Sequence, residues 1–180
     1  MGCGGNCGGG GVDVALFASA SHESFDAVVN HTYSVPMFGT LLGLEREGDL
    51  IRCDHDLDFY TPLGQSLDVV PPGLVKSYEE KLPTGVLTQT AFQHAERRRL
   101  FIDVFSLIEN GDEVMIRMVH RRKPKGKTTY KFPRRWFEEL ESVEYEWCEV
   151  LMPVHRRELL AAIYGSGWQT KQCKWRHPRD

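Results

Sequence analysis

The feature that most restricts the fold is a short segment in which acidic and non-acidic residues alternate, DHDLDF at residues 54–59. Alternation with a period of two is typical of a half-buried β-strand, whose successive side chains point to opposite faces. On such a strand Asp54, Asp56 and Asp58 share one face, and neighbours on that face lie roughly 6.5–7 Å apart. Carboxylates gathered so closely repel one another unless a cation neutralises them. The segment therefore predicts a strand that carries a site for Mg2+, a cation that prefers oxygen ligands.

A turn with a glycine at each end, GTLLG at residues 39–43, comes shortly before the acids. The apolar residues 35–38 predict a buried strand that runs into this turn, and residues 41–47 predict a short helix that begins at it. The first turn of a helix leaves backbone N–H groups without partners, and these groups favour phosphate. The turn is therefore expected to bind phosphate next to the acidic strand.

Asp103 is the one charge in an otherwise apolar run, residues 100–107, which has the composition of a strand. An ionised carboxylate is costly in such a run unless it pairs with a cation or ligates a metal ion. One explanation is an ion pair with Arg117 or with an arginine of residues 97–99. The other is a shared cation, because adjacent strands lie about 4.8 Å apart and would bring Asp103 close to residues 54–58. A pair of carboxylates and a single one on neighbouring strands would suit metal-assisted phosphoryl or nucleotidyl transfer.

The whole chain is expected to form one α+β domain. Its 180 residues, 41% hydrophobic and 26% charged, are enough for one core. We expect a flexible Gly/Cys-rich tail over residues 1–20, the domain over 21–170 and a second tail over 171–180. The net charge of −3 gives no reason to expect nucleic-acid binding, and no apolar run approaches the ~18 residues of a membrane span. The further predicted elements are helices at 23–31, 74–81 and 155–164, strands at 86–92 and 100–108, and a hairpin formed by 113–120 and 128–132.

The cysteines and the N-terminal sequence bear on location. The five cysteines are odd in number and do not suggest a disulfide framework, so we expect a reducing compartment, the cytoplasm. The Met-Gly-Cys start allows myristoylation of Gly2 and palmitoylation of Cys3, which would attach the chain to a membrane, and the alternative is a plain tail. A zinc site that joins the two tails is a further alternative, with the ligands Cys3, Cys7, Cys173 and His177.

Several other side chains have a structural explanation beside a functional one. Cys53 and Cys148 are expected to be small packed side chains rather than nucleophiles. The basic segment 117–131 would either bind an anionic acceptor or lipid surface or form a solvated hairpin tip. Solvated or capping roles are expected for the histidines His94, His120 and His155. The core is the expected place of the later aromatic residues, with stacking on a sugar or base as the alternative, namely Trp136, Phe137, Trp147 and Trp168.

The order of these motifs carries a resemblance to a known family. Together they resemble the signature of the LicD/fukutin family, a branch of the nucleotidyltransferase fold. The acid motif alone is weak, and the specificity comes from the ordered set. This set runs from about Tyr33 to Trp168 and comprises the turn at 39–43, Arg46, Gly48, Ile51, Asp54, Asp56, Asp58, Ile102-Asp103-Val104-Phe105, Phe137-Glu138, Val150-Leu151-Met152-Pro153, Tyr164-Gly165 and Trp168.

The resemblance implies a single domain of the polymerase-beta type, with a mixed sheet flanked by helices. It also implies a transferase that depends on Mg2+ or Mn2+. Such an enzyme would move phosphocholine or a polyol phosphate, such as ribitol phosphate, from a CDP-linked donor to a glycan or other hydroxyl acceptor. By the same resemblance, metal binding and catalysis fall to Asp56, Asp58 and Asp103, with Asp103 as the base and Asp54 as a second-choice ligand. Binding of the donor phosphates falls to Gly39, Thr40, Gly43 and Arg46.

Two hypotheses of other kinds stand beside this one. In the first, the same fold transfers a nucleotidyl group from an NTP to a small molecule, and the released product is pyrophosphate instead of CMP. In the second, the chain is a catalytically silent binding module, tethered to a membrane or not. Three converging acids weigh against the silent module, because a domain without catalysis has no need of them.

Overall fold

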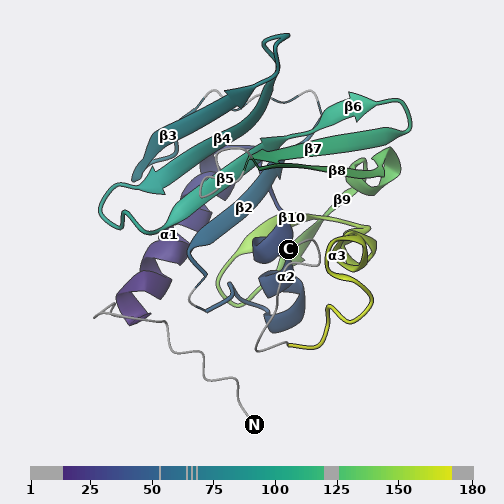
Figure 1. Ribbon diagram of the computed structural model, residues 1–180. Helices are drawn as coiled ribbons and strands as arrows, with labels where there is room; N and C mark the ends of the chain where they lie inside the picture. Colours follow the sequence, from purple (N-terminus) through teal and green to yellow (C-terminus); the bar gives the residue numbers. More distant parts are fainter. Residues whose placement is uncertain are drawn as a thin grey trace.

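The computed structural model describes residues 14–52, 54–63, 65, 67, 69–119 and 126–171. Within these residues the chain forms an α+β domain (Figure 1). None of the described helices is long and apolar enough to cross a membrane. In chain order the elements are α1 (Val14–His31), β1 (Val35–Pro36), α2 (Phe38–Glu47), β2 (Asp56–Thr61), β3 (Leu74–Lys81), β4 (Leu87–His94), β5 (Phe101–Ser106), β6 (Ile108–Asn110), β7 (Glu113–Val119), β8 (Lys127–Pro133), the 3-10 turn η1 (Arg134–Phe137), β9 (Leu140–Glu144), β10 (Glu149–Pro153) and α3 (Arg156–Tyr164).

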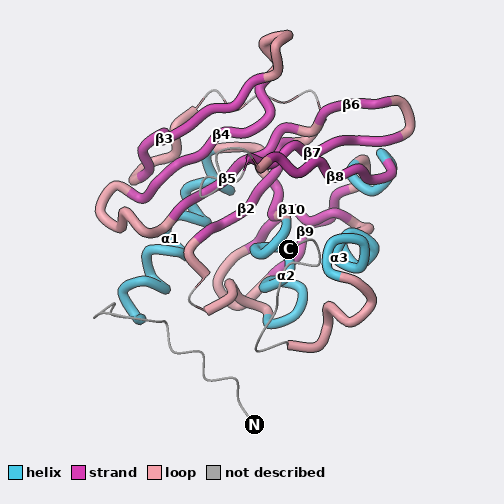
Figure 2. The backbone as a smooth tube through the Cα atoms, viewed as in Figure 1, coloured by secondary structure: helices cyan, strands magenta, loops and turns pink. Residues whose placement is uncertain are grey.

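The central element is a mixed five-stranded sheet with the strand order β1-β2-β5-β4-β3. β2 and β5 run parallel, whereas every other pair of neighbours in this sheet is antiparallel. Two smaller antiparallel sheets, β6-β7-β8 and β9-β10, complete the strand framework (Figure 2). β2 lies between β5, which pairs with its whole length, and the short β1, which pairs with Phe59 and Tyr60. Its side chains alternate between the two faces of the sheet.

Helix α1 covers one face of the five-stranded sheet, and Figure 1 shows it crossing behind the strands. This face is formed by alternate residues of the central strands, such as Leu57 and Phe59 of β2 and Ile102 of β5, all of which are buried. The ring centroid of Phe25 in α1 lies 5.4 Å from that of Phe59. The predicted alternation within residues 54–59 is therefore confirmed, because its apolar members pack against the helix.

The opposite face of the sheet carries a second core, which the β6-β7-β8 sheet and α3 cover. Tyr60 of β2, Phe105 of β5 and Leu159 of α3 belong to it, and each of them is fully buried. Asp56 and Asp58 precede Tyr60 at intervals of two residues, so they lie on this same face, nearer the start of β2. There the sheet is less covered, and the Asp56 side chain is exposed.

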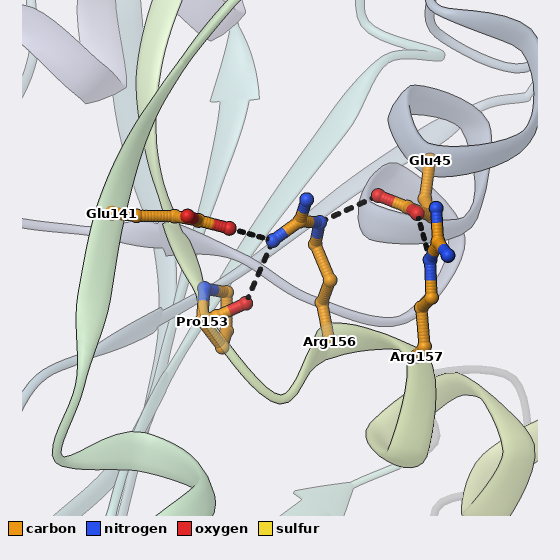
Figure 3. A network of polar contacts seen from close by, with 5 residues as sticks. All are labelled: Glu45, Glu141, Pro153, Arg156 and Arg157. Carbon is orange, nitrogen blue, oxygen red and sulfur yellow. Dashed lines mark hydrogen bonds and ion pairs between the residues drawn. The ribbon is translucent and has the colours of Figure 1, made fainter.

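An ion-pair network joins α2 to α3 (Figure 3). The side chain of Glu45, in the last turn of α2, is only 7% exposed and accepts hydrogen bonds from Nε of Arg156 at 2.6 Å and Nε of Arg157 at 2.8 Å. Arg156 also donates to Glu141 of β9 and to the carbonyl oxygen of Pro153. Figure 3 shows the Glu45 carboxylate lying between the two guanidinium groups. The end of α2 that lies far from the acids is thus fixed to the C-terminal helix.

Most predicted elements are confirmed with shifted ends, including the acidic strand, the β7-β8 hairpin and α3. The turn expected over residues 39–43 is wrong, because α2 already begins at Phe38 and these residues are helical. The helix predicted over residues 74–81 is wrong, because this segment is β3 and its backbone pairs with β4 at the edge of the sheet. Helix α1 begins at Val14, so residues 14–20, which were expected in the N-terminal tail, are helical. The helix predicted over 23–31 is the second half of α1. Strands β9 and β10 have no counterpart among the predicted elements.

Candidate metal centre

Two neighbouring strands bring three carboxylates together. In the parallel pairing of β2 with β5, Asp58 lies opposite Asp103, and Asp56 comes two residues earlier on the same face of β2. One carboxylate oxygen from each of Asp56, Asp58 and Asp103 lies within 4.8 Å of the other two. The sequence predicted this proximity only if the two strands were neighbours, and their pairing is confirmed.

The first turn of α2 borders the cluster and is tied to β2 through Asp58. The backbone N–H of Asp58 donates to the hydroxyl of Thr40 at 2.8 Å, and its carbonyl oxygen accepts from the N–H of Met37 at 2.9 Å. The N–H of Gly39 donates to Oδ2 of Asp58 at 3.4 Å. A Cβ on Gly39 would lie 3.1 Å from Oδ2 of Asp54 and 3.7 Å from Oδ2 of Asp58. Glycine at position 39 therefore lets the start of the helix approach the acids closely.

Phe38 begins α2 in a conformation that is rare for a bulky residue. Its φ of 44° lies in the left-handed region, where an L side chain is strained. Its ring is buried, with its centroid 5.5 Å from that of Phe105 and 5.0 Å from that of Tyr130. This aromatic packing holds the strained turn that directs the N–H of Gly39 toward the acids.

Burial and repulsion by neighbouring carboxylates raise the pKa values of two of the acids, Asp54 and Asp58. Burial raises the pKa of Asp58 well above its usual range, and the charges of Asp56, Asp103 and Asp54 raise it further. Burial also raises the pKa of Asp54 to about 8, and the hydrogen bond with Asp56 and the charge of Asp56 add to the shift. Asp54 thus interacts electrostatically with the cluster. Its carboxylate is not one of the three that each place an oxygen within 4.8 Å of the other two.

Gln89 is a contact of the cluster that the sequence analysis missed. It lies on β4, it is 1% exposed, and its Nε2 donates to Oδ1 of Asp103 at 2.9 Å. Its Oε1 accepts from the backbone N–H of Val119 at 2.9 Å. Nothing in the local sequence of β4 marks this glutamine, since its position depends on how three strands are arranged.

Tyr164, at the end of α3, also lies near the acids. Burial raises the pKa of its phenol above the ordinary range, and the charges of Asp58, Asp54 and Asp56 add to the effect, as does Tyr130. The phenol therefore stays protonated at neutral pH. In the sequence Tyr164 stands out only as part of the family motif, and the structure places its phenol where the charges of the acids act on it.

Three of the predicted phosphate ligands, Gly43, Arg46 and Thr40, have structural contacts of their own. A Cβ on Gly43 would lie 2.7 Å from the carbonyl oxygen of Asp49 and 2.9 Å from the N of Ile51, so close packing of α2 already requires glycine there. Arg46, near the end of α2, donates from Nη2 to Oε1 of Glu47 at 2.5 Å. Thr40 is buried and holds the backbone of β2. Phosphate binding by Gly39, Thr40, Gly43 and Arg46 stays a prediction.

The structural explanations of several other residues are confirmed. Cys148 packs against the core that lies between α1 and the five-stranded sheet. Burial raises the pKa of its thiol to about 11, so the thiol stays protonated. His94 accepts at Nδ1 from the N–H groups of Glu96 and Arg97, which is a capping role. The aromatic side chains Trp136, Phe137, Trp147 and Trp168 all pack in or against the two cores.

Other expectations fall on residues that the structure does not describe. Cys53, His120 and the proposed zinc ligands Cys3, Cys7, Cys173 and His177 lie outside the described residues, as do Gly2 and Cys3 with their expected acyl groups. The basic segment 117–131 is described at 117–119 and 126–131. Acylation, membrane contact and a cytoplasmic location stay predictions.

The donor set fits a hard divalent cation. All three clustered ligands are carboxylate oxygens, which Mg2+ and Mn2+ prefer. Asp58 and Asp103 are half-buried while Asp56 is exposed, so the cluster is open to solvent on one side. Mg2+ sites of this kind use one or two carboxylates and complete the coordination with water and substrate phosphates.

The comparison with known families agrees with this geometry. The family model described as the LicD/FKTN/FKRP nucleotidyltransferase domain matches residues 32–155, a range that includes the first turn of α2 and all four acids. No protein of curated function matches the chain. The chain belongs to the LicD/FKTN/FKRP family, and this membership indicates a transferase.

Proposed function

We propose that this chain is a Mg2+- or Mn2+-dependent transferase with a polymerase-beta-type nucleotidyltransferase fold. Its reaction moves a phospho-alcohol, either phosphocholine or a polyol phosphate, from a CDP-linked donor to a hydroxyl group of a glycan-type acceptor. The observation that carries the proposal is the carboxylate cluster of Asp56, Asp58 and Asp103, whose oxygens lie within 4.8 Å of one another. Family membership supports the transferase class, and the mixed sheet with its parallel β2-β5 pair is compatible with the fold.

The three acids have separate roles in this proposal. Asp56 and Asp58 hold the cation together with Asp103, and a cation bound there neutralises charge on the donor's phosphate oxygens. Asp103 accepts the proton of the attacking hydroxyl. The oxygen of that hydroxyl forms a bond to the phosphorus that bears the alcohol, and the bond from this phosphorus to the bridging oxygen breaks. CMP leaves with the electron pair of the broken bond.

Backbone N–H groups near the acids can donate hydrogen bonds to the phosphates of the CDP-linked substrate. The N-terminus of α2 favours negative charge, and Gly39, which has no Cβ, lets this helix begin close to Asp54 and Asp58. The Glu45 network holds α2, the helix that supplies these N–H groups, against α3.

A thermal-shift series with and without Mg2+ tests the class of substrate. CDP-choline, CDP-ribitol, CDP-glycerol, CTP and ATP are compared, and a ligand present at a hundred times its Kd stabilises the protein by about 2.7 kcal/mol. A Mg2+-dependent shift with CDP-alcohols alone, with release of CMP, is the expected result. A shift with NTPs alone and release of pyrophosphate would favour nucleotidyl transfer, and the absence of any shift would favour the silent binding module.

Asp58→Asn provides the matching test of the site. The variant is expected to fold, because it removes a carboxylate whose ionisation the neighbouring carboxylates oppose, and to lose both the Mg2+ dependence and the turnover. Asp112→Asn is the control, since Asp112 is exposed in the turn between β6 and β7, away from the cluster. Normal turnover in Asp58→Asn would remove the metal-site assignment.

A further inference from the structure

We infer that Gln89 is the positioning residue of the metal centre, which orients the Asp103 carboxylate toward the cation and leaves its negative charge intact. The inference rests on the proposed function, because it concerns the same three acids. Gln89 lies outside the sequence motif of residues 54–58, on β4, which pairs directly with β5, the strand that bears Asp103.

The strand register explains how Gln89 reaches Asp103. On β4 and β5, Gln89 pairs with Phe105 and Ala91 pairs with Asp103. Gln89 is therefore the diagonal neighbour of Asp103 on the same face, and the long side chain of a glutamine can span such a diagonal. The residue directly opposite Asp103 is alanine, whose small side chain leaves this path open. The resulting bond from Nε2 of Gln89 to Oδ1 of Asp103 is 2.9 Å long.

The backbone of β7 fixes which way the Gln89 amide points. Its Oε1 accepts from the N–H of Val119 at 2.9 Å, so its NH2 group must face Asp103. The reversed amide would set two donors against each other at Val119 and two acceptors against each other at Asp103. Since Gln89 is 1% exposed, water cannot replace either bond readily, and the amide is held from both sides.

The amide group suits this role better than a cationic side chain would. An arginine or lysine at the same place would neutralise the Asp103 charge and compete with the metal ion for it. A neutral amide donor restricts the orientation of the carboxylate while the charge stays available to the cation. Residues in this relation to a metal ligand typically change the metal affinity by about 10- to 100-fold when they are replaced.

Gln89→Met tests the inference, since methionine has a similar length and removes both hydrogen bonds. Gln93→Met is the matched control, because Gln93 lies on the same strand and the same face and donates to the carbonyl oxygen of Arg98. Mn2+ affinity is measured by electron paramagnetic resonance or by calorimetry on the full chain, and the Tm of the metal-free protein is measured in parallel. We expect Gln89→Met to weaken Mn2+ binding by about tenfold or more and Gln93→Met to leave it unchanged.

A second variant keeps the test decisive if Gln89→Met does not fold. Gln89→Asn retains the amide but is one methylene shorter, so it cannot hold Val119 and Asp103 together, and the same loss of affinity is expected. Wild-type Mn2+ affinity in a folded Gln89 variant, even with a lowered Tm, would show a merely structural role and overturn the inference alone. Failure of the unaltered protein to bind Mn2+ would overturn the proposed metal centre and this inference with it.

Discussion

The raised pKa of Asp54 predicts that the metal-free protein loses stability as the pH rises. In the folded chain this pKa is about 8, compared with 3.8 for an unperturbed aspartate. The folded state therefore binds the proton more tightly than the unfolded state does. The stabilisation that results is complete below the unfolded value and is lost as the pH rises through the folded one, at about 1.4 kcal/mol per pH unit between them.

The magnitude follows from the two pKa values. Between pH 5 and pH 7 the contribution of Asp54 to the free energy of unfolding should fall by about 2–3 kcal/mol. For a chain of this size that corresponds to a decrease in Tm of roughly 4–12 °C. The raised pKa of Asp58 changes stability in the same direction, so the decrease in the wild-type protein should be at least this large.

Thermal unfolding in EDTA across this pH range measures the effect, and Asp54→Asn isolates the contribution of Asp54. The variant should be more stable than the wild-type protein at pH 7 and should depend less on pH, because it has no carboxylate to ionise. Asp112→Asn, at an exposed turn, should follow the wild-type curve. Saturating Mn2+ should flatten the wild-type curve, since a cation favours the ionised acids. A wild-type Tm that is constant or rises between pH 5 and pH 7 in EDTA would refute this reasoning.

Three further predictions concern the position of α2, and each is checked by chemical denaturation. Gly43→Ala should cost about 1–3 kcal/mol, since its Cβ would lie 2.7 Å from the Asp49 carbonyl oxygen, while Gly167→Ala, with open space around it, should be neutral. Glu45→Gln should lower the free energy of unfolding by about 2–3 kcal/mol. This is less than for a fully broken buried ion pair, because Arg156 still pairs with Glu141 in the variant. Glu144→Gln, at an exposed position, is the control. Phe38→Gly should be about 1 kcal/mol more stable than Phe38→Ala, because only glycine is unstrained at a φ of 44°; the reverse order would contradict the strain assignment.

The acids were predictable from the sequence because the pattern that reveals them is local. A strand's period of two places Asp56 and Asp58 on one face, whatever the rest of the fold. The lone charge of Asp103 in an apolar run indicated a cationic partner, but it did not distinguish an arginine from a metal ion. The parallel register that sets Asp103 beside Asp58 is a long-range property, so the sequence could state it only as a condition.

The failures arise where long-range contacts decide the structure. Residues 74–81, LVKSYEEK, contain helix-forming lysine and glutamate, but pairing with β4 makes them an edge strand whose polar side chains remain in water. Gln89 could not be distinguished from any other glutamine, because its role depends on the positions of Asp103 and Val119 on two other strands. Tyr164 likewise reaches the acids only through the packing of α3.

The Glu45 network has a practical consequence for where the folding unit ends. The family match stops at residue 155, one position before Arg156, the first of the two arginines that hold the Glu45 carboxylate. A chain trimmed to the matched residues would leave this carboxylate buried without either cation and would remove Leu159, Leu160 and Ile163 from the cores. At the other end it would lose α1, and with it the cover of one sheet face. The smallest stable version of this protein should therefore extend from α1 through α3, beyond the segment by which the family is recognised.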